Sequence, residues 1–110
     1  MSSNTDYDVI VIGAGAAGMM SAGAAASRGR KVLLLEKNKV VGKKLSITGG
    51  GRCNITNDTP DFKEFLESFP TAKKYLYSPF SKFSVQDTFD FFCSLGLETV
   101  TQARKRAFPA

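Results

Sequence analysis

The sequence contains no histidine and only two cysteines, Cys53 and Cys93, which lie forty positions apart. Protein zinc sites are built from closely spaced cysteines and histidines, and this chain has no CxxC pair. A structural disulfide is equally unexpected, because such bonds are rare in cytosolic proteins. We therefore expect no metal site and no disulfide framework.

Long hydrophobic runs are also missing. The apolar stretch from Val9 to Met20 is shorter than the roughly 18 residues that a membrane helix needs. The segment before it carries Asp6 and Asp8 but no lysine or arginine, unlike the basic start of a secretory signal peptide. These features predict a cytoplasmic protein without a membrane partner.

The remaining composition is typical of a soluble globular protein, with 43% hydrophobic and 23% charged residues among 110. This length corresponds to one small domain or to part of one. The net charge is +5, but the basic residues are scattered except at Arg104, Lys105 and Arg106. Scattered basic residues favour a solvated surface over nucleic-acid binding, which remains the less favoured alternative.

The segment Tyr7 to Glu36 reads as strand, glycine-rich loop, helix and strand. Val9 to Ile12 suit a parallel strand buried on both faces. In the loop GAGAAG, Gly13 permits the turn out of the strand and Gly15 has no β-carbon to block a pyrophosphate. Gly18 allows the helix to pack closely on the sheet.

The ends of this segment suggest how a nucleotide would be held. A helix beginning near Ala16 offers unpaired N–H groups and its positive dipole end to a phosphate, and Gly29 is expected to end it. Glu36, at the end of the second strand, suits the hydroxyls of an adenosine ribose and disfavours NADP at this site. An isolated GxGxxG is also compatible with a simple glycine-rich turn, but here the flanking pattern favours an ADP-containing dinucleotide.

A second glycine-rich segment follows where another crossover helix would be expected. Gly49 to Gly51 indicate close backbone approach or positive φ angles, and Lys43, Lys44 and Arg52 flank them with positive charge. Such a loop suits the distal half of FAD, whereas NAD alone gives no reason for it. A flexible surface loop is the alternative.

The stretch GKKLSITGGGRCNITN, behind YDVIVIGAGAAG and LLLEKN, resembles the BaiN-type NAD(P)/FAD-dependent oxidoreductases, also described as aminoacetone-oxidase-family FAD-binding enzymes. The TGGGRCN match is highly specific, and the resemblance extends through SLGLETV to RAFP. There the family's GRVFP element has glycine where this chain has Lys105 and valine where it has Ala107. The resemblance covers essentially the whole chain but only about the first quarter of a family member, whose C-terminal domains would be its missing partners.

The resemblance implies an α/β fold: an incomplete Rossmann-like FAD-binding domain, with a dinucleotide-binding core in residues 1–58 and a helical segment and strand in residues 59–110. It implies FAD as cofactor, NADH or NADPH as electron donor, and a small organic substrate that receives a hydride. No residue is assignable as a catalytic acid or base, and 110 residues are too few for activity alone. The expected FAD-binding residues are Gly13, Gly15, Ala16, Ala17, Gly18, Glu36, Lys37, Lys44, Gly50, Gly51, Arg52, Cys53 and Asn54.

Two other functions stay open. One is a non-catalytic dinucleotide-binding or interaction module, and the other, based on fold analogy and basic charge, is an FAD-dependent tRNA-modifying enzyme. Disulfide reductases share the first fingerprint but use a cysteine pair, whereas this chain offers only Cys53 near the expected cofactor. We expect Cys53 to be a small buried residue beside the cofactor.

Beyond residue 60 the pattern becomes helical. The spacing predicts a short helix that ends at Pro70. One face of this helix is apolar and carries Phe62, Phe65, Leu66 and Phe69. Ser84 and Asp87 form a capping-box pattern for a second helix that Gly96 ends, with Cys93 expected to pack on its apolar side. Leu97 to Val100 read as a strand. Phenylalanines at this spacing favour a core over a ligand channel.

Overall fold

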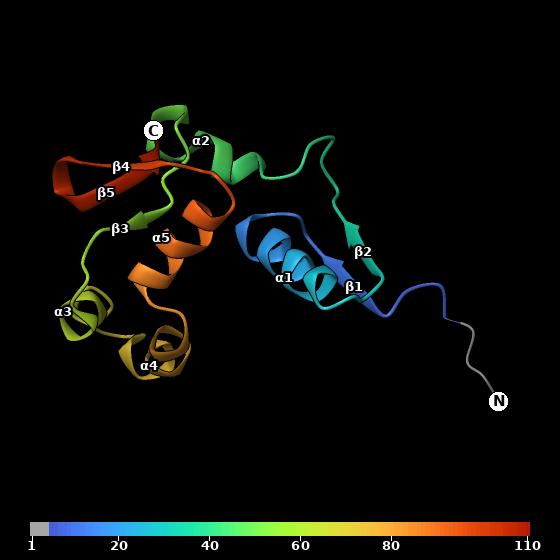
Figure 1. Ribbon diagram of the computed structural model, residues 1–110, viewed down its shortest axis with the longest axis horizontal. Coiled ribbons are helices and arrows are strands. Elements are labelled where there is room, and N and C mark those ends of the chain that lie inside the picture. The colour runs from blue at the N-terminus through green and yellow to red at the C-terminus, as the bar shows by residue number, and fades with distance from the viewer. Residues whose placement is uncertain (1–4) are drawn as a thin grey trace. The chain divides into compact units, whose positions relative to one another are not determined.

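The computed structural model describes residues 5–110, and these form two compact units (Figure 1). The first unit runs to Gly51 and the second from Arg52 to Ala110. The structure places residues 52–58 with the second unit because the strand Thr56–Asn57 pairs within its sheet.

The first unit is a strand–helix–strand arrangement. Strands β1 (Val9–Ile12) and β2 (Val32–Leu35) pair in parallel, from Val9 opposite Val32 to Ile12 opposite Leu35. Helix α1 (Ala16–Ser27) connects them, and Gly29 follows it with a φ of +75°. The predicted α/β arrangement is therefore confirmed.

The packing of α1 on β1 depends on Gly18. A β-carbon at Gly18 would lie 1.7 Å from the Gly13 carbonyl oxygen and 3.5 Å from Val11, so no other residue fits without movement of the backbone. The predicted reason for this glycine is therefore confirmed.

Within the described part of the first unit, residues 5–51, the second face of β1 is not covered. Val9 and Val11 are half-buried, whereas Ile10 is 58% and Ile12 85% exposed. The expectation of a strand buried on both faces is therefore wrong for this chain, because α1 covers only the side of the sheet on which Val11 lies.

The second glycine-rich segment begins with a short helix that the sequence analysis did not expect. Helix α2 spans Lys43–Gly51, but Thr48, Gly49 and Gly50 leave the helical conformation within it. Gly49 and Gly50 have φ angles of +60° and +70°, as the glycine run predicted. The regular part of the helix therefore ends before the glycines.

The second unit contains an antiparallel sheet in the order β3–β5–β4. Its strands are β3 (Thr56–Asn57), β4 (Thr99–Gln102) and β5 (Arg106–Pro109). Strand β4 begins two residues later than the predicted strand. A short 3-10 turn (Ala103–Lys105) joins β4 to β5, and Arg104 and Lys105 adopt positive φ angles of 61° and 56° there.

Three helices accompany this sheet: α3 (Phe62–Glu67), α4 (Lys73–Lys82) and α5 (Val85–Ser94). The predicted capping box of α5 is present, since the Ser84 and Asp87 side chains each accept from the other's backbone N–H. Helix α4 was not predicted. It contains Pro79, a residue that normally signals a helix boundary.

The apolar core of the second unit gathers side chains from α3, α5 and β5. Its buried residues are Phe65, Leu66, Val85, Ala107 and Phe108. The Phe65 ring also contacts α4, with its centroid 4.8 Å from that of Phe80. Phe65 and Leu66 of the predicted stripe are therefore core, whereas Phe69 lies beyond the end of α3 and is 37% exposed. Among residues 5–110, no helix is long and apolar enough to cross a membrane.

Candidate functional site

A cavity of about 490 Å³ in the first unit contains several of the predicted residues. It lies where β1 and β2 end and α1 begins, which is the usual position of ligand sites in parallel α/β sheets. Both the glycine-rich loop and the acid after β2 contribute to it. Its lining residues are Ala14, Gly15, Glu36, Lys37, Asn38, Lys43, Lys44 and Ile47.

The backbone of Ala14 connects three parts of this site. Its N–H donates to Glu36 Oε2 at 3.0 Å, and its carbonyl accepts from the Gly42 N–H at 2.7 Å. The preceding Gly13 N–H donates to the Leu35 carbonyl at 2.8 Å. Ala14 itself is completely buried. The glycine-rich loop is thus held against the end of β2 and against the segment that leads to α2.

The Glu36 carboxylate is held in place by hydrogen bonds at both oxygens. Oε1 accepts from the backbone N–H of Asn38 at 3.2 Å and from its side-chain amide at 3.1 Å. The Asn38 N–H, and after it the Ala14 N–H, lower the pKa of Glu36 below its ordinary value. Glu36 is therefore ionised at neutral pH and is an acceptor for hydroxyl groups.

The first turn of α1 has the features of an anion site. Gly15 is its N-cap, in an extended conformation and without a side-chain cap, and the first turn contains no acidic residue. The amides of Ala16, Ala17 and Gly18 have no intrahelical acceptor at such a position, and the helix dipole is positive there. A β-carbon at Gly15 would meet nothing within 4 Å, so nothing in the described chain itself requires glycine.

The remaining predicted residues fall into two sets. Lys37 and Lys44 line the cavity. Gly50 and Gly51 do not line it; they come after its last lining residue in the sequence, still within the first unit, and have φ angles of +70° and +89°. Arg52, Cys53 and Asn54 belong to the second unit.

In the second unit the Arg52 guanidinium lies 4.3 Å from the centre of the Phe108 ring and donates to Gln102 at 2.7 Å. Cys53 is half-buried with a φ of +62°, and Asn54 is half-buried. These three residues are thus part of the folded second unit, where Arg52 packs on the end of β5.

Sequence reasoning missed three lining residues: Ala14, Asn38 and Ile47. Asn38 had a usable signal, because an asparagine two positions after an acid is suited to a local turn that caps it. Ala14 had none, since its contribution is made by backbone groups and depends on the position of Glu36.

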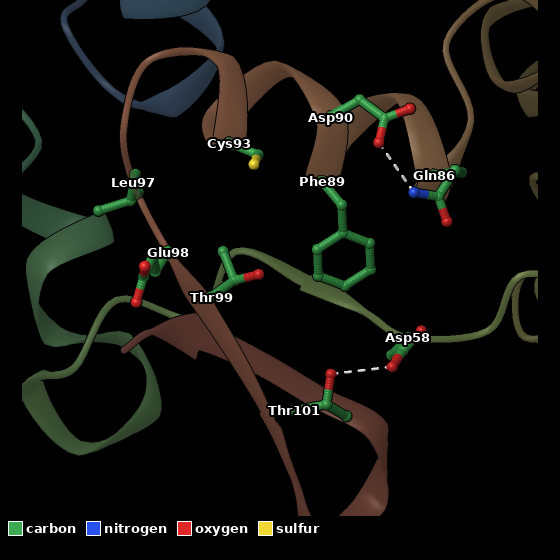
Figure 2. A pocket seen from close by; sticks show the side chains of 9 residues that line it. All are labelled: Asp58, Gln86, Phe89, Asp90, Cys93, Leu97, Glu98, Thr99 and Thr101. Carbon is green, nitrogen blue, oxygen red and sulfur yellow. Dashed lines mark hydrogen bonds between the residues drawn. The ribbon is translucent and has the colours of Figure 1, made fainter.

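A second cavity, of about 570 Å³, lies between α5 and β4 in the second unit (Figure 2). Two of its three carboxylates have protein partners: Asp58 accepts from Thr101 at 2.8 Å, and Asp90 accepts from Gln86 at 2.9 Å. Cys93 was predicted to pack on the apolar side of α5, but it is exposed, because its turn of α5 faces this opening. No predicted site residue lines this cavity.

Comparison with known proteins identifies relatives with redox names. A ribosomal RNA dihydrouridine synthase of Escherichia coli is 40% identical over 81 residues, which are 74% of this chain and 20% of the relative. A 3-dehydro-bile acid delta(4,6)-reductase of Clostridium scindens is 40% identical over 91 residues, 81% of this chain and 22% of the relative. A 3-oxosteroid 1-dehydrogenase of Mycolicibacterium smegmatis is 28% identical over 102 residues, 93% of this chain and 18% of the relative.

The chain therefore spans about a fifth of the length of these relatives. The family described as the HI0933-like protein Rossmann domain matches residues 7–110, nearly the whole chain. This match confirms the resemblance found in the sequence and the Rossmann type of the α/β fold. The chain belongs to the HI0933-like Rossmann-domain family.

Proposed function

We propose that this chain is the FAD-binding N-terminal part of a flavoprotein oxidoreductase. The contact that carries the proposal is the one between the Ala14 N–H and the Glu36 carboxylate. It brings an ionised acid to the start of a helix whose first amides have no acceptor within the helix. A group with two hydroxyls next to a diphosphate, such as the ADP half of FAD, matches this arrangement.

The residues of the first unit fit the ADP half of FAD. Glu36 would accept hydrogen bonds from the ribose hydroxyls, and the amides from Gly15 to Gly18 would bind the diphosphate. The open space at Gly15 supports this fit, because a side chain there would occupy the region in front of the helix start. Lys37 and Lys44 add positive charge beside the same cavity.

The flavin half would lie toward the second glycine-rich segment. The positive φ angles of Gly50 and Gly51 support close backbone approach there, and Arg52, Cys53 and Asn54 continue the segment. FAD would supply hydride transfer to such a protein, while the chain binds and orients it. We further propose NADH or NADPH as the donor.

The relatives' names suggest the chemistry of the acceptor. They describe the formation of dihydrouridine, the reduction of a bile acid and the dehydrogenation of a 3-oxosteroid. Each of these reactions forms or removes a carbon–carbon double bond near a carbonyl group. We therefore propose that the whole protein acts on a carbon–carbon double bond that a neighbouring carbonyl polarises.

The test is a titration of the purified protein with FAD, followed by flavin absorbance and fluorescence. We expect weak or substoichiometric binding in which ADP competes and FMN, which lacks the adenosine, does not. Gly15→Val should abolish binding and Glu36→Ala should weaken it, while Gly23→Ala serves as the control because a β-carbon there meets nothing within 4 Å. Full FAD occupancy in Gly15→Val would contradict the assignment.

A second candidate is an RNA-modifying flavoenzyme, favoured by the Escherichia coli relative named as a ribosomal RNA dihydrouridine synthase. The third, a non-catalytic dinucleotide-binding module, would bind flavin without turnover. Reduction of the flavin-loaded full-length protein by NADH or NADPH distinguishes an oxidoreductase from such a module.

A further inference from the structure

Helix α4 presents an exposed face of unusual composition. The helix has three lysines, two tyrosines and no acidic residue. At 100° per residue, a stripe of exposed residues runs along one side, and we call it the α4 outer face. It consists of Lys74, Tyr75, Ser78, Ser81 and Lys82.

The opposite side of α4 is anchored in the second unit. Leu76 and Phe80 are half-buried there, and the Phe80 ring packs against Phe65 with centroids 4.8 Å apart. Tyr77, next to the outer face, packs edge-on against Phe62 at 5.1 Å. These contacts determine which residues α4 turns toward solvent.

The outer face combines exposed aromatic surface with positive charge. Tyr75 on this face is 79% exposed, and Tyr77 beside the face is 59% exposed. Lys73 pairs with Glu67, but within residues 5–110 neither Lys74 nor Lys82 forms an ion pair. Their attachment points are eight residues apart, which corresponds to about 12 Å along a helix. A hollow of about 590 Å³ at the Lys74 end of the helix is lined by Pro70, Thr71, Lys73, Lys74 and Tyr77.

We propose that the α4 outer face binds a segment of single-stranded RNA. Lys74 and Lys82 would contact backbone phosphates, and the Tyr75 ring would stack on a base. The charge of the face is complementary to a polyanion. A membrane surface is the less suitable partner, because helices that lie on membranes expose large apolar residues where this face carries serines.

The name of the Escherichia coli relative, a ribosomal RNA dihydrouridine synthase, agrees with RNA binding but does not locate it on the chain. The inference goes beyond the proposed function, since α4 contributes nothing to the cavity at Glu36. RNA binding is therefore measured without flavin, and its failure would leave the FAD titration unaffected.

The experiment measures fluorescence anisotropy of a labelled oligouridylate of roughly 12 nucleotides with the 110-residue protein. We expect binding that weakens between about 50 and 200 mM salt. The slope of log affinity against log salt concentration is negative. Replacing both lysines (Lys74→Ala with Lys82→Ala) should make it shallower by about 1.4, the value for two phosphate contacts to a single strand. Tyr75→Ala should weaken binding by about fivefold or more.

A matched control removes the same charge elsewhere, by Lys31→Ala with Lys63→Ala, both of which are exposed. Circular dichroism of each variant verifies that it is folded. The proposal is overturned if the control reduces affinity as much as the outer-face variant does. It is also overturned if Tyr75→Ala has no effect, or if phosphatidylglycerol vesicles bind while the oligonucleotide does not.

Discussion

The two units of this chain differ in how they are held together. Within residues 5–51, the buried apolar side chain is Ala14, whereas the second unit buries Phe65, Leu66, Val85, Ala107 and Phe108. The first unit instead relies on backbone pairing and on the hydrogen bonds around Ala14 and Glu36. Burial of apolar surface is the main source of folding stability, so we expect the first unit to be less stable than the second.

This contrast has a consequence for function. The unit with the proposed nucleotide site exposes Ile10, Ile12 and Leu35, while the unit with the core carries few of the proposed site residues. A ligand that binds only the folded form stabilises it by mass action. We therefore expect FAD to stabilise the first unit more than the second.

The largest effect should come from breaking the second unit's core. Phe108→Ala removes a ring that is 1% exposed, and such a change costs about 3–5 kcal/mol. Ile12→Ala, at a side chain that is 85% exposed, should change the unfolding free energy by less than about 0.5 kcal/mol. Urea unfolding followed by circular dichroism checks both. Equal losses would show that Ile12 is buried in solution.

A pair of glycines in α1 tests the packing of the first unit. Gly18→Ala would place a β-carbon 1.7 Å from the Gly13 carbonyl oxygen and should cost about 1–3 kcal/mol. Gly23→Ala, in the same helix but facing open space, should stabilise by about 0.5–1 kcal/mol. Thermal unfolding measures the two. If both variants changed the unfolding temperature in the same direction and by a similar amount, the close contact of α1 with the loop would be refuted.

A smaller effect is expected at the turn between β4 and β5. Lys105 has a φ of +56°, and a non-glycine residue there is strained by about 1–2 kcal/mol. Lys105→Gly relieves the strain but removes the exposed ion pair with Glu64, which is worth about 0–1 kcal/mol. Lys105→Ala loses the ion pair and keeps the strain.

We therefore expect the glycine variant to be more stable than the alanine variant by about 1 kcal/mol, measured by urea unfolding. Glycine is also the residue that the family's GRVFP element has at this position. An alanine variant as stable as the glycine variant would mean that the turn is not strained.

The smallest effect compares one carboxylate in each unit. The pKa of Glu36 is lowered, first by the Asn38 N–H, and the pKa of Asp87 is lowered, first by the Ser84 hydroxyl. A carboxyl group whose pKa is lowered on folding stabilises the folded state at pH values above its pKa in the unfolded chain. That unfolded-state pKa is about 4.3 for glutamate and about 3.9 for aspartate. That contribution is lost as the pH falls through the folded pKa.

NMR titration of the Ala14 and Ser84 amide signals should reveal these transitions below those values. Glu36→Gln should remove the transition at Ala14 alone, and Asp87→Asn the one at Ser84 alone. A transition at Ala14 that persists in Glu36→Gln would contradict the observed hydrogen bond.

Local patterns predicted much of the fold. The strand–helix–strand segment, Gly18 and the Ser84–Asp87 capping box were predicted because each depends on residues that are near one another in sequence. Helix α4 was missed because Pro79 lies inside it. Strands β3 and β5 were missed because they are short and depend on pairing with distant segments, β3 with β5 and β5 with both β3 and β4.

For the candidate site, the sequence by itself determined which kinds of groups are present: a glycine-rich helix start, an acid after a buried-type strand and a run of glycines. Only the tertiary structure decided that Ala14 links the acid and the segment before α2 to the glycine-rich loop, and that Asn38 lowers the pKa of Glu36. The same holds for the contrast between the two units. Residue type determines how much apolar surface a segment has, but burial depends on which other segments cover it, as the exposed Ile12 and the buried Phe108 show.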